Sequence, residues 1–179
     1  MNNPEMRTLA VIDRHLNVPH HGKSICREAV RAIVIMQGRL LMVHSRVNGD
    51  YKFPGGGIEP EECHEAALVR EMAEESGGRV TSKPVPFGKV MEYDFPVEKC
   101  FNSFCMTSYY YRCEVDPVLG AQQLDEYEAR LGFTPEWVDI DAALENNKRL
   151  LSSGKKVERW VKRETRVLEI IKQELINIL

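Results

Sequence analysis

The chain lacks a long apolar run, an excess of basic residues and a secretory leader, and each absence excludes a class of protein. The longest strictly apolar stretch, residues 32–36, is far shorter than the roughly 20 residues of a membrane-spanning helix. Lys and Arg number 24 against 27 Asp and Glu, for a net charge of −3, so the electrostatic footprint of a nucleic-acid-binding protein is missing. Residues 1–10 have neither the charged nor the apolar region of a signal peptide. We therefore expect a cytoplasmic protein with no nucleic-acid partner and no membrane partner.

Cysteine usage excludes two further kinds of structure. The count of five is odd, and no C-x-x-C pair occurs. A disulfide framework or a zinc site is therefore not expected, and free thiols suit a cytosolic protein. At 179 residues with 43% hydrophobic residues, the chain is long enough for one domain with a proper core.

A predicted helix with three glutamates on one face is the main chemical signal. Residues 62–76 contain no proline or glycine and are rich in helix formers, and two glycines at 77–78 end the run. Glu71, Glu74 and Glu75 stand at i, i+3 and i+4, which puts three carboxylates on one face. They repel one another near the helix C-terminus, where the macrodipole also disfavours anions. A divalent cation would remove this conflict, and oxygen ligands suit Mg²⁺ or Mn²⁺.

The stretch 56–78, which we call the box, resembles the Nudix box G-x5-E-x7-R-E-U-x-E-E-x-G-U, where U is a bulky apolar residue. The matching positions are Gly56, Glu62, Arg70, Glu71, Met72, Glu74, Glu75 and Gly77. The box departs from the pattern only at its last place, which is held by Gly78.

The resemblance implies site roles for the residues in and just before the box. It implies a metal-dependent attack of water on a diphosphate linkage, with Mg²⁺ as the cofactor and Mn²⁺ as an alternative. We expect Glu71, Glu74 and Arg70 to be catalytic, Arg70 bracing the glycine loop through a carboxylate, with Glu62 as its partner. The expected metal ligands are Glu71, Glu74, Glu75 and Glu62. Residues predicted to bind substrate are Gly55, Gly56, Gly57, Tyr51 and Phe53, although aromatic residues in strands more often belong to the core.

A further carboxylate is expected from the acidic segment 116–132, because the box places its glutamates on only one wall of a site. Segments of this length without secondary structure are often functional or mobile. Asp125, Glu126 and Glu128 are the candidates, and Glu126 and Glu128 are favoured for reach. The alternative is a solvated loop without a catalytic role.

The order of predicted elements indicates an α/β fold. Residues 1–27 are interpreted as an N-terminal arm with a short strand near Thr8, and residues 28–179 as the domain. The expected strands cover 29–36 and 39–44, a hairpin around Gln37-Gly38, followed by 79–95, 104–115 and 133–140. A short helix at 142–147 follows a capping Asp139 or Asp141, and an amphipathic helix covers 155–179. This mixture predicts an α/β/α sandwich with a mixed β-sheet, the fold that the Nudix resemblance also implies.

The leading functional hypothesis is a pyrophosphohydrolase acting on a small-molecule nucleotide. The substrate classes left open are nucleoside triphosphates, nucleotide sugars and dinucleoside polyphosphates. The alternative is a Nudix-like sensor that binds a nucleotide without hydrolysing it. The presence of all three glutamates argues against a sensor, because a sensor need not keep metal ligands. A homodimer is a third, compatible possibility, because Ile176, Ile178 and Leu179 exceed what one domain is expected to bury.

Overall fold

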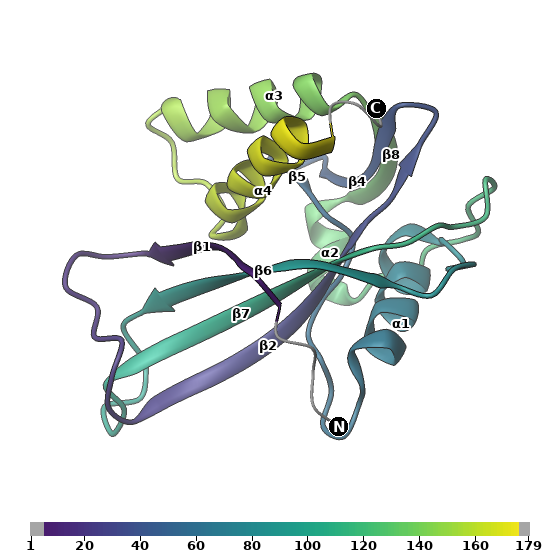
Figure 1. The fold of residues 1–179 in the computed structure, drawn as a ribbon. Coiled ribbons are helices and arrows are strands. Elements are labelled where there is room, and N and C mark those ends of the chain that lie inside the picture. The colour runs from purple at the N-terminus through teal and green to yellow at the C-terminus, as the bar shows by residue number, and fades with distance from the viewer. Residues whose placement is uncertain (1–5, 176–179) are drawn as a thin grey trace.

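The main sheet of the molecule is mixed and has four strands in the order β1-β6-β7-β2 (Figure 1). A computed structural model describes residues 6–175 of the chain. β1 pairs with β6 in parallel, β6 pairs with β7 antiparallel, and β7 pairs with β2 in parallel. The strands are β1 (Thr8–Asp13), β2 (Ser24–Ile33), β6 (Val85–Asp94) and β7 (Ser103–Arg112).

A second, antiparallel sheet is built around β4. This strand pairs with β3 and β5 and also with β8. The turn between β3 and β4 has positive φ at Gln37 (51°) and Gly38 (74°), as tight hairpin turns require, and it confirms the predicted hairpin. The strands are β3 (Ile35–Met36), β4 (Arg39–Ser45), β5 (Tyr51–Lys52) and β8 (Phe133–Val138).

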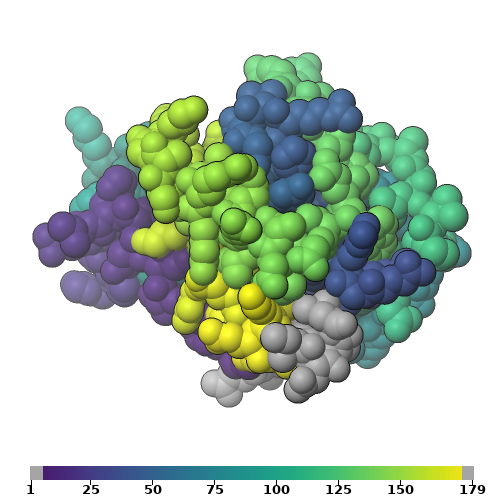
Figure 2. Space-filling view, turned by 90° about the horizontal axis from the view of Figure 1, so that it is seen from above, coloured from purple at the N-terminus to yellow at the C-terminus, as the bar shows by residue number. Residues whose placement is uncertain are grey.

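Helices cover both sides of the sheets, which gives the predicted α/β/α layering. α1 lies on one side and α3 and α4 on the other (Figure 1). In the space-filling view from above, α3 and α4 form one continuous outer surface (Figure 2). The helices are α1 (His64–Ser76), α2 (Glu126–Leu131), α3 (Ile140–Ser152) and α4 (Trp160–Leu175).

Alternating side chains of the strands fill two separate cores. Val30 and Ala32 of β2 pack with Leu68 of α1, whereas Ile33 packs with Leu168 of α4. This alternation is what a strand buried on both faces requires. The α/β/α sandwich with a mixed sheet expected from the sequence is therefore confirmed.

The N-terminal segment contributes directly to the main sheet. β1 forms one edge of that sheet beside β6, close to the short strand predicted near Thr8. β2 begins at Ser24, so the expected boundary between residues 27 and 28 falls inside a strand. The segment before residue 28 is thus integrated into the fold and is more than an arm.

Several predicted elements differ in extent from the observed ones; the strand expected at 79–95, for example, is β6 over Val85–Asp94. The segment 116–132, expected to be a loop, contains the six-residue helix α2. The helix predicted at 142–147 is longer and runs over Ile140–Ser152, with Asp139 as its N-cap. The C-terminal helix begins at Trp160 rather than 155. The apolar residues that suggested a homodimer, 176–179, lie outside the described residues.

No helix within residues 6–175 is long and apolar enough to cross a membrane. All five cysteines are free thiols.

Candidate active site

The glycine segment before α1 is held against β2 as if it were one more strand. Val30 N–H donates to the Gly56 carbonyl (3.0 Å), and Ala32 N–H donates to the Pro54 carbonyl (2.9 Å). Gly55 has φ 137°, and a Cβ there would lie 2.1 Å from the Val30 carbonyl oxygen. Only glycine fits this close approach, so the residue type at this position determines the path of the loop where the box begins.

Helix α1 ends at a glycine pair that is covered by a later segment. Gly77 takes the left-handed conformation (φ 67°) that often ends helices. Gly120 N–H donates to the Gly77 carbonyl (2.8 Å). At Gly78, the one departure from the box pattern, a Cβ would lie 3.0 Å from Met72 Cε and 3.7 Å from Leu119 Cδ2. Met72 and Leu119 thus fill the space beside that glycine.

Arg70 joins three of the predicted glutamates to the glycine loop. Its Nε and Nη2 donate to the two carboxylate oxygens of Glu62 (2.9 and 2.8 Å), which confirms the predicted pairing. Its Nη2 also donates to the Gly57 carbonyl (3.0 Å). Its Nη1 donates to Glu71 (2.8 Å) and Glu74 (3.2 Å). The hydrogen bonds that Arg70 donates to Glu62 raise the pKa of Arg70 and lower the pKa of Glu62.

Glu71 is a predicted ligand that packs directly against the loop. Its carboxylate covers Gly56 so tightly that a Cβ on Gly56 would lie 2.3 Å from Oε2. Burial raises the pKa of Glu71, and the hydrogen bond from Arg70 opposes that rise. Because Glu71 and Glu74 accept from the same Arg70 nitrogen, two carboxylates of one helix face converge on a single cationic group.

Glu75 is directed away from Arg70 into a buried ion pair. Its side chain is 2% exposed and pairs with Lys52 Nζ of β5. Its other oxygen, Oε2, accepts from Gly55 N–H (2.8 Å). Lys52 also lies over the Phe133 ring, 4.8 Å from its centre. Sequence reasoning missed Lys52, and the available signal was a lysine placed between two aromatic residues immediately before the glycine loop.

Of the two favoured carboxylates in segment 116–132, only Glu128 lies at the site. Burial, and a hydrogen bond with Glu75, raise the pKa of Glu128 to about 7. Asp125 caps α2 by accepting from Glu128 N–H (2.7 Å), while Glu128 accepts from Asp125 N–H (3.0 Å). This reciprocal capping box positions the Glu128 side chain. Glu126, on the same helix, is exposed.

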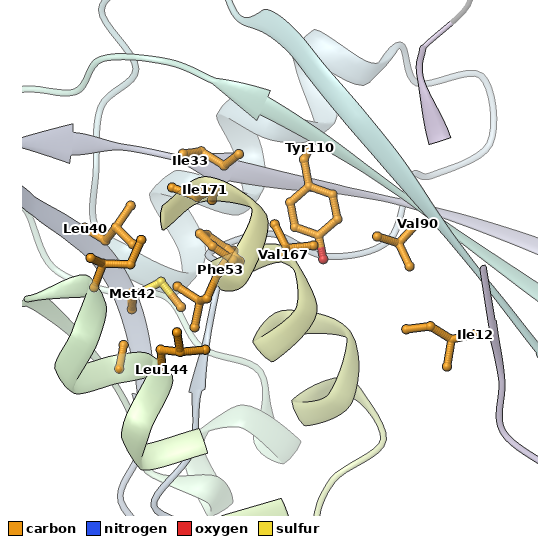
Figure 3. Packing of buried hydrophobic residues seen from close by; sticks show 13 residues of the cluster. Ile12, Ile33, Leu40, Met42, Phe53, Val90, Tyr110, Leu144, Val167 and Ile171 are labelled. Carbon is orange, nitrogen blue, oxygen red and sulfur yellow. The ribbon is translucent and has the colours of Figure 1, made fainter. Parts of the chain in front are cut away.

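The two aromatic residues expected to stack on a base differ in accessibility. Phe53 has no exposed surface and lies edge-on to Tyr110, with ring centres 5.6 Å apart. Figure 3 shows Phe53 in the middle of the core, among Leu40, Met42 and Val167. The expectation that Phe53 contacts substrate is wrong, because the apolar layer under α3 and α4 encloses the ring. Tyr51 is half-buried, stacks on His44 and donates to Glu136 (3.1 Å).

The donor set of this site suits a hard divalent ion held by few protein ligands. No three His, Cys, Asp or Glu side chains within residues 6–175 form a ready cluster for a metal. Glu71 and Glu74 nevertheless supply oxygens that converge on Arg70 Nη1, and the missing side chain of Gly56 leaves room for the Glu71 carboxylate beside the loop. Mg²⁺ is commonly bound by one or two carboxylates together with waters and substrate phosphates, so these residues fit such an ion.

Comparison with known proteins identifies similar sequences for the central part of the chain. A family model described as NUDIX domain matches residues 27–161, well over half of the 179 residues. The putative 8-oxo-dGTP diphosphatase YtkD of Bacillus subtilis is 42% identical over 64 residues, which are 36% of this chain and 35% of that protein. The CTP pyrophosphohydrolase of Escherichia coli is 38% identical over 58 residues, 30% of this chain and 43% of that protein. The chain thus aligns with less than half the length of these curated relatives.

Solved structures with the same fold cover more of the chain. A NUDIX hydrolase from Nitrosomonas europaea has a TM-score of 0.54 at 18% identity, covering 86% of this chain and 95% of that one. A MutT NUDIX hydrolase from Burkholderia pseudomallei has a TM-score of 0.50 at 16% identity, covering 80% and 96%. At these identities the likeness concerns the fold.

Proposed function

Since the chain belongs to the NUDIX domain family, we propose that it is a metal-dependent pyrophosphohydrolase acting on a diphosphate linkage in a nucleoside diphosphate derivative. The observation that carries this proposal is the convergence of Glu62, Glu71 and Glu74 on Arg70 beside the glycine loop. Among the three substrate classes, nucleoside triphosphates are favoured, because the names of two relatives refer to 8-oxo-dGTP and CTP.

The residues of the box would hold the cofactor, Mg²⁺ or Mn²⁺. Glu71 and Glu74 are the best-placed ligands for the ion. Glu62 contacts the same arginine, Arg70, and would supply further oxygens. Glu75 joins them only by exchanging its bond with Lys52 for the ion. When bound, such an ion neutralises charge on the phosphoryl oxygens and acidifies a bound water.

The chain itself supplies positioning and electrostatics. Arg70 fixes the loop by bonding the Gly57 carbonyl and keeps the Glu71 and Glu74 carboxylates together despite their repulsion. The backbone of residues 55–57 lets a phosphate approach closely, since it carries no side chains. Tyr51 is the remaining aromatic candidate for contact with the nucleotide. Glu71 or Glu74 orients the attacking water and accepts its proton.

The competing function is a sensor that binds a nucleotide without cleaving it. A sensor needs no carboxylates converging on one point, whereas Glu71 and Glu74 both accept from Arg70 Nη1 beside the glycine loop. Hydrolysis is therefore the better account.

A substrate panel tests the proposal and separates it from the sensor. Purified protein is incubated with nucleoside triphosphates, including oxidised ones, with nucleotide sugars and with dinucleoside polyphosphates, each with Mg²⁺ and with Mn²⁺. We expect release of pyrophosphate, or of phosphate and a nucleotide, from at least one class. Tight binding of a panel member without cleavage under either ion would establish the sensor instead.

Glu128→Gln is expected to lower turnover by more than tenfold, about 1.4 kcal/mol of transition-state stabilisation. Glu128 lies beside Glu75 and comes from α2, so we propose it as the carboxylate that a diphosphate site needs from outside the box. Glutamine preserves the capping box, because its side chain still accepts from Asp125 N–H. Steady-state kinetics with the best substrate of the panel measures the effect.

Glu126→Gln is the matched control for Glu128→Gln, because it removes the same charge from an exposed position of the same helix. We expect its turnover to stay within twofold of the original protein, roughly 0.4 kcal/mol. Equal turnover in both variants would remove α2 from the catalytic machinery.

A further inference from the structure

Arg31 of β2 is a buried cation whose hydrogen-bonding capacity is only partly used. It is 9% exposed, and neither Nε nor Nη1 has a partner within the described part of the chain, residues 6–175. Buried guanidinium groups are normally neutralised and fully hydrogen-bonded, because burying an unpaired charge is costly. Arg163 follows that rule, since it pairs with Glu92 and Glu164. Arg31 thus has two buried donors with no acceptor among the described residues.

The position of Arg31 connects these free donors to the glycine loop. The backbone bonds of Val30 and Ala32 to the loop place Arg31 opposite Gly55. A Cβ on Gly55 would lie 3.0 Å from the Arg31 Cα, so the two backbones are in direct contact. On its other side, Arg31 is paired with Tyr110 of β7. Arg31 therefore lies between the core and the loop that carries the candidate site.

The carboxylate of Glu71 lies against the loop residue next to Gly55. A Cβ on Gly56 would lie 2.3 Å from Glu71 Oε2. An anion bound between Arg31 and an ion on Glu71 would be attracted from both sides. No other buried arginine combines a place against the glycine loop with free donors in the described residues.

We propose that Arg31 is a substrate-binding residue that takes phosphoryl oxygens of the diphosphate through Nε and Nη1. A phosphoryl anion both accepts from the two nitrogens and neutralises the buried charge, whereas a neutral nucleobase would satisfy only the hydrogen bonds. Several anionic oxygens of a diphosphate are available to the two donors. The identity of the anion rests on the proposed function, but the presence of an anion site at Arg31 does not.

The test measures binding of inorganic pyrophosphate to the full chain without divalent cations, by calorimetry and by thermal melting. We expect Arg31→Met to weaken this binding at least tenfold and Arg31→Lys to weaken it less. Lysine keeps the positive charge but lacks the planar guanidinium, which can donate two parallel hydrogen bonds. Arg14→Met is the matched control: Arg14 is also largely buried with a free Nε, but it pairs with Glu92 of β6. We expect Arg14→Met to bind pyrophosphate as the original protein does.

Kinetics on the best nucleotide of the panel provides the second measurement. We expect Arg31→Met to raise KM at least tenfold, with Arg31→Lys recovering part of the loss and Arg14→Met unchanged. Unaltered pyrophosphate affinity and unaltered KM in Arg31→Met would overturn the proposal, and so would failure of the original protein to bind pyrophosphate. Arg31-dependent binding of pyrophosphate without hydrolysis of any nucleotide would uphold the anion site and reject the proposed hydrolase.

Discussion

Replacing Glu75 by glutamine is expected to lower both the stability of the fold and its turnover. The carboxylate is buried and neutralises Lys52, which is itself 9% exposed. Removing one partner of a buried ion pair leaves the other charge uncompensated, which costs about 3 kcal/mol or more. For a chain of this size, that loss corresponds to a fall in melting temperature of roughly 6–12 °C. The sequence alone predicts only the catalytic loss, because it gives no sign that Lys52 reaches Glu75.

The expected loss of turnover has a different origin, namely the proposed role of Glu75 as a metal ligand. If Glu75 exchanges Lys52 for the ion, glutamine should lower turnover at least a hundredfold, about 2.7 kcal/mol. Glu65→Gln is the matched control, because Glu65 lies on α1 but is exposed. We expect Glu65→Gln to change neither the melting temperature nor the turnover measurably. Circular dichroism melts and initial rates below the melting transition record the two effects separately.

The double variant Lys52→Met with Glu75→Gln separates structure from catalysis. Removing both charges eliminates the unpaired cation, and replacing a buried ion pair by uncharged groups is often neutral for stability. The amide oxygen of the introduced glutamine can still accept from Gly55 N–H, as the Glu75 carboxylate does. We expect the melting temperature to return toward that of the original protein while turnover stays low. Recovery of turnover together with stability would show that Glu75 acts through the fold and not on the metal.

The box positions were predictable because their spacing and the helix period together define a geometry. Glu71 and Glu74 had to share a face of α1, and a glycine-rich loop had to precede them. The bond between Arg70 and Glu62 was expected only from the resemblance, and the structure contains it. Local periodicity is enough here, because all these residues lie within one loop and one helix.

The interactions that the sequence did not predict join segments that are far apart in the chain. Lys52 of β5 and Glu75 of α1 are 23 residues apart in the chain and meet only in the fold, and Glu128 reaches them from α2. Helix α2 is six residues long, too short for a periodic pattern, although Asp125 and Glu128 have the spacing of a capping box. Phe53 was misassigned because alternation in a two-residue strand does not indicate which side chain enters the core.

Removal of divalent cations should abolish hydrolysis without unfolding the protein. Glu71 and Glu74 already share the Arg70 guanidinium, so their charges are compensated within the chain itself. A structural metal would behave differently, because its removal would also lower the free energy of unfolding. We therefore expect EDTA to reduce turnover to background and to shift the melting temperature by less than roughly 2 °C, equivalent to less than about 1 kcal/mol.

Restoring activity with different ions then identifies the ligand chemistry. Mg²⁺ or Mn²⁺ should restore full turnover to EDTA-treated protein, because carboxylate oxygens suit hard ions. A zinc-selective chelator should have no effect, since the predicted ligands include no cysteine or histidine. Glu71→Gln should raise the Mg²⁺ concentration needed for half-maximal activity, and the exposed Glu65→Gln should leave it unchanged. Full turnover in excess EDTA would reject the metal-dependent mechanism, since Glu71 and Glu74 would then need no partner beyond Arg70.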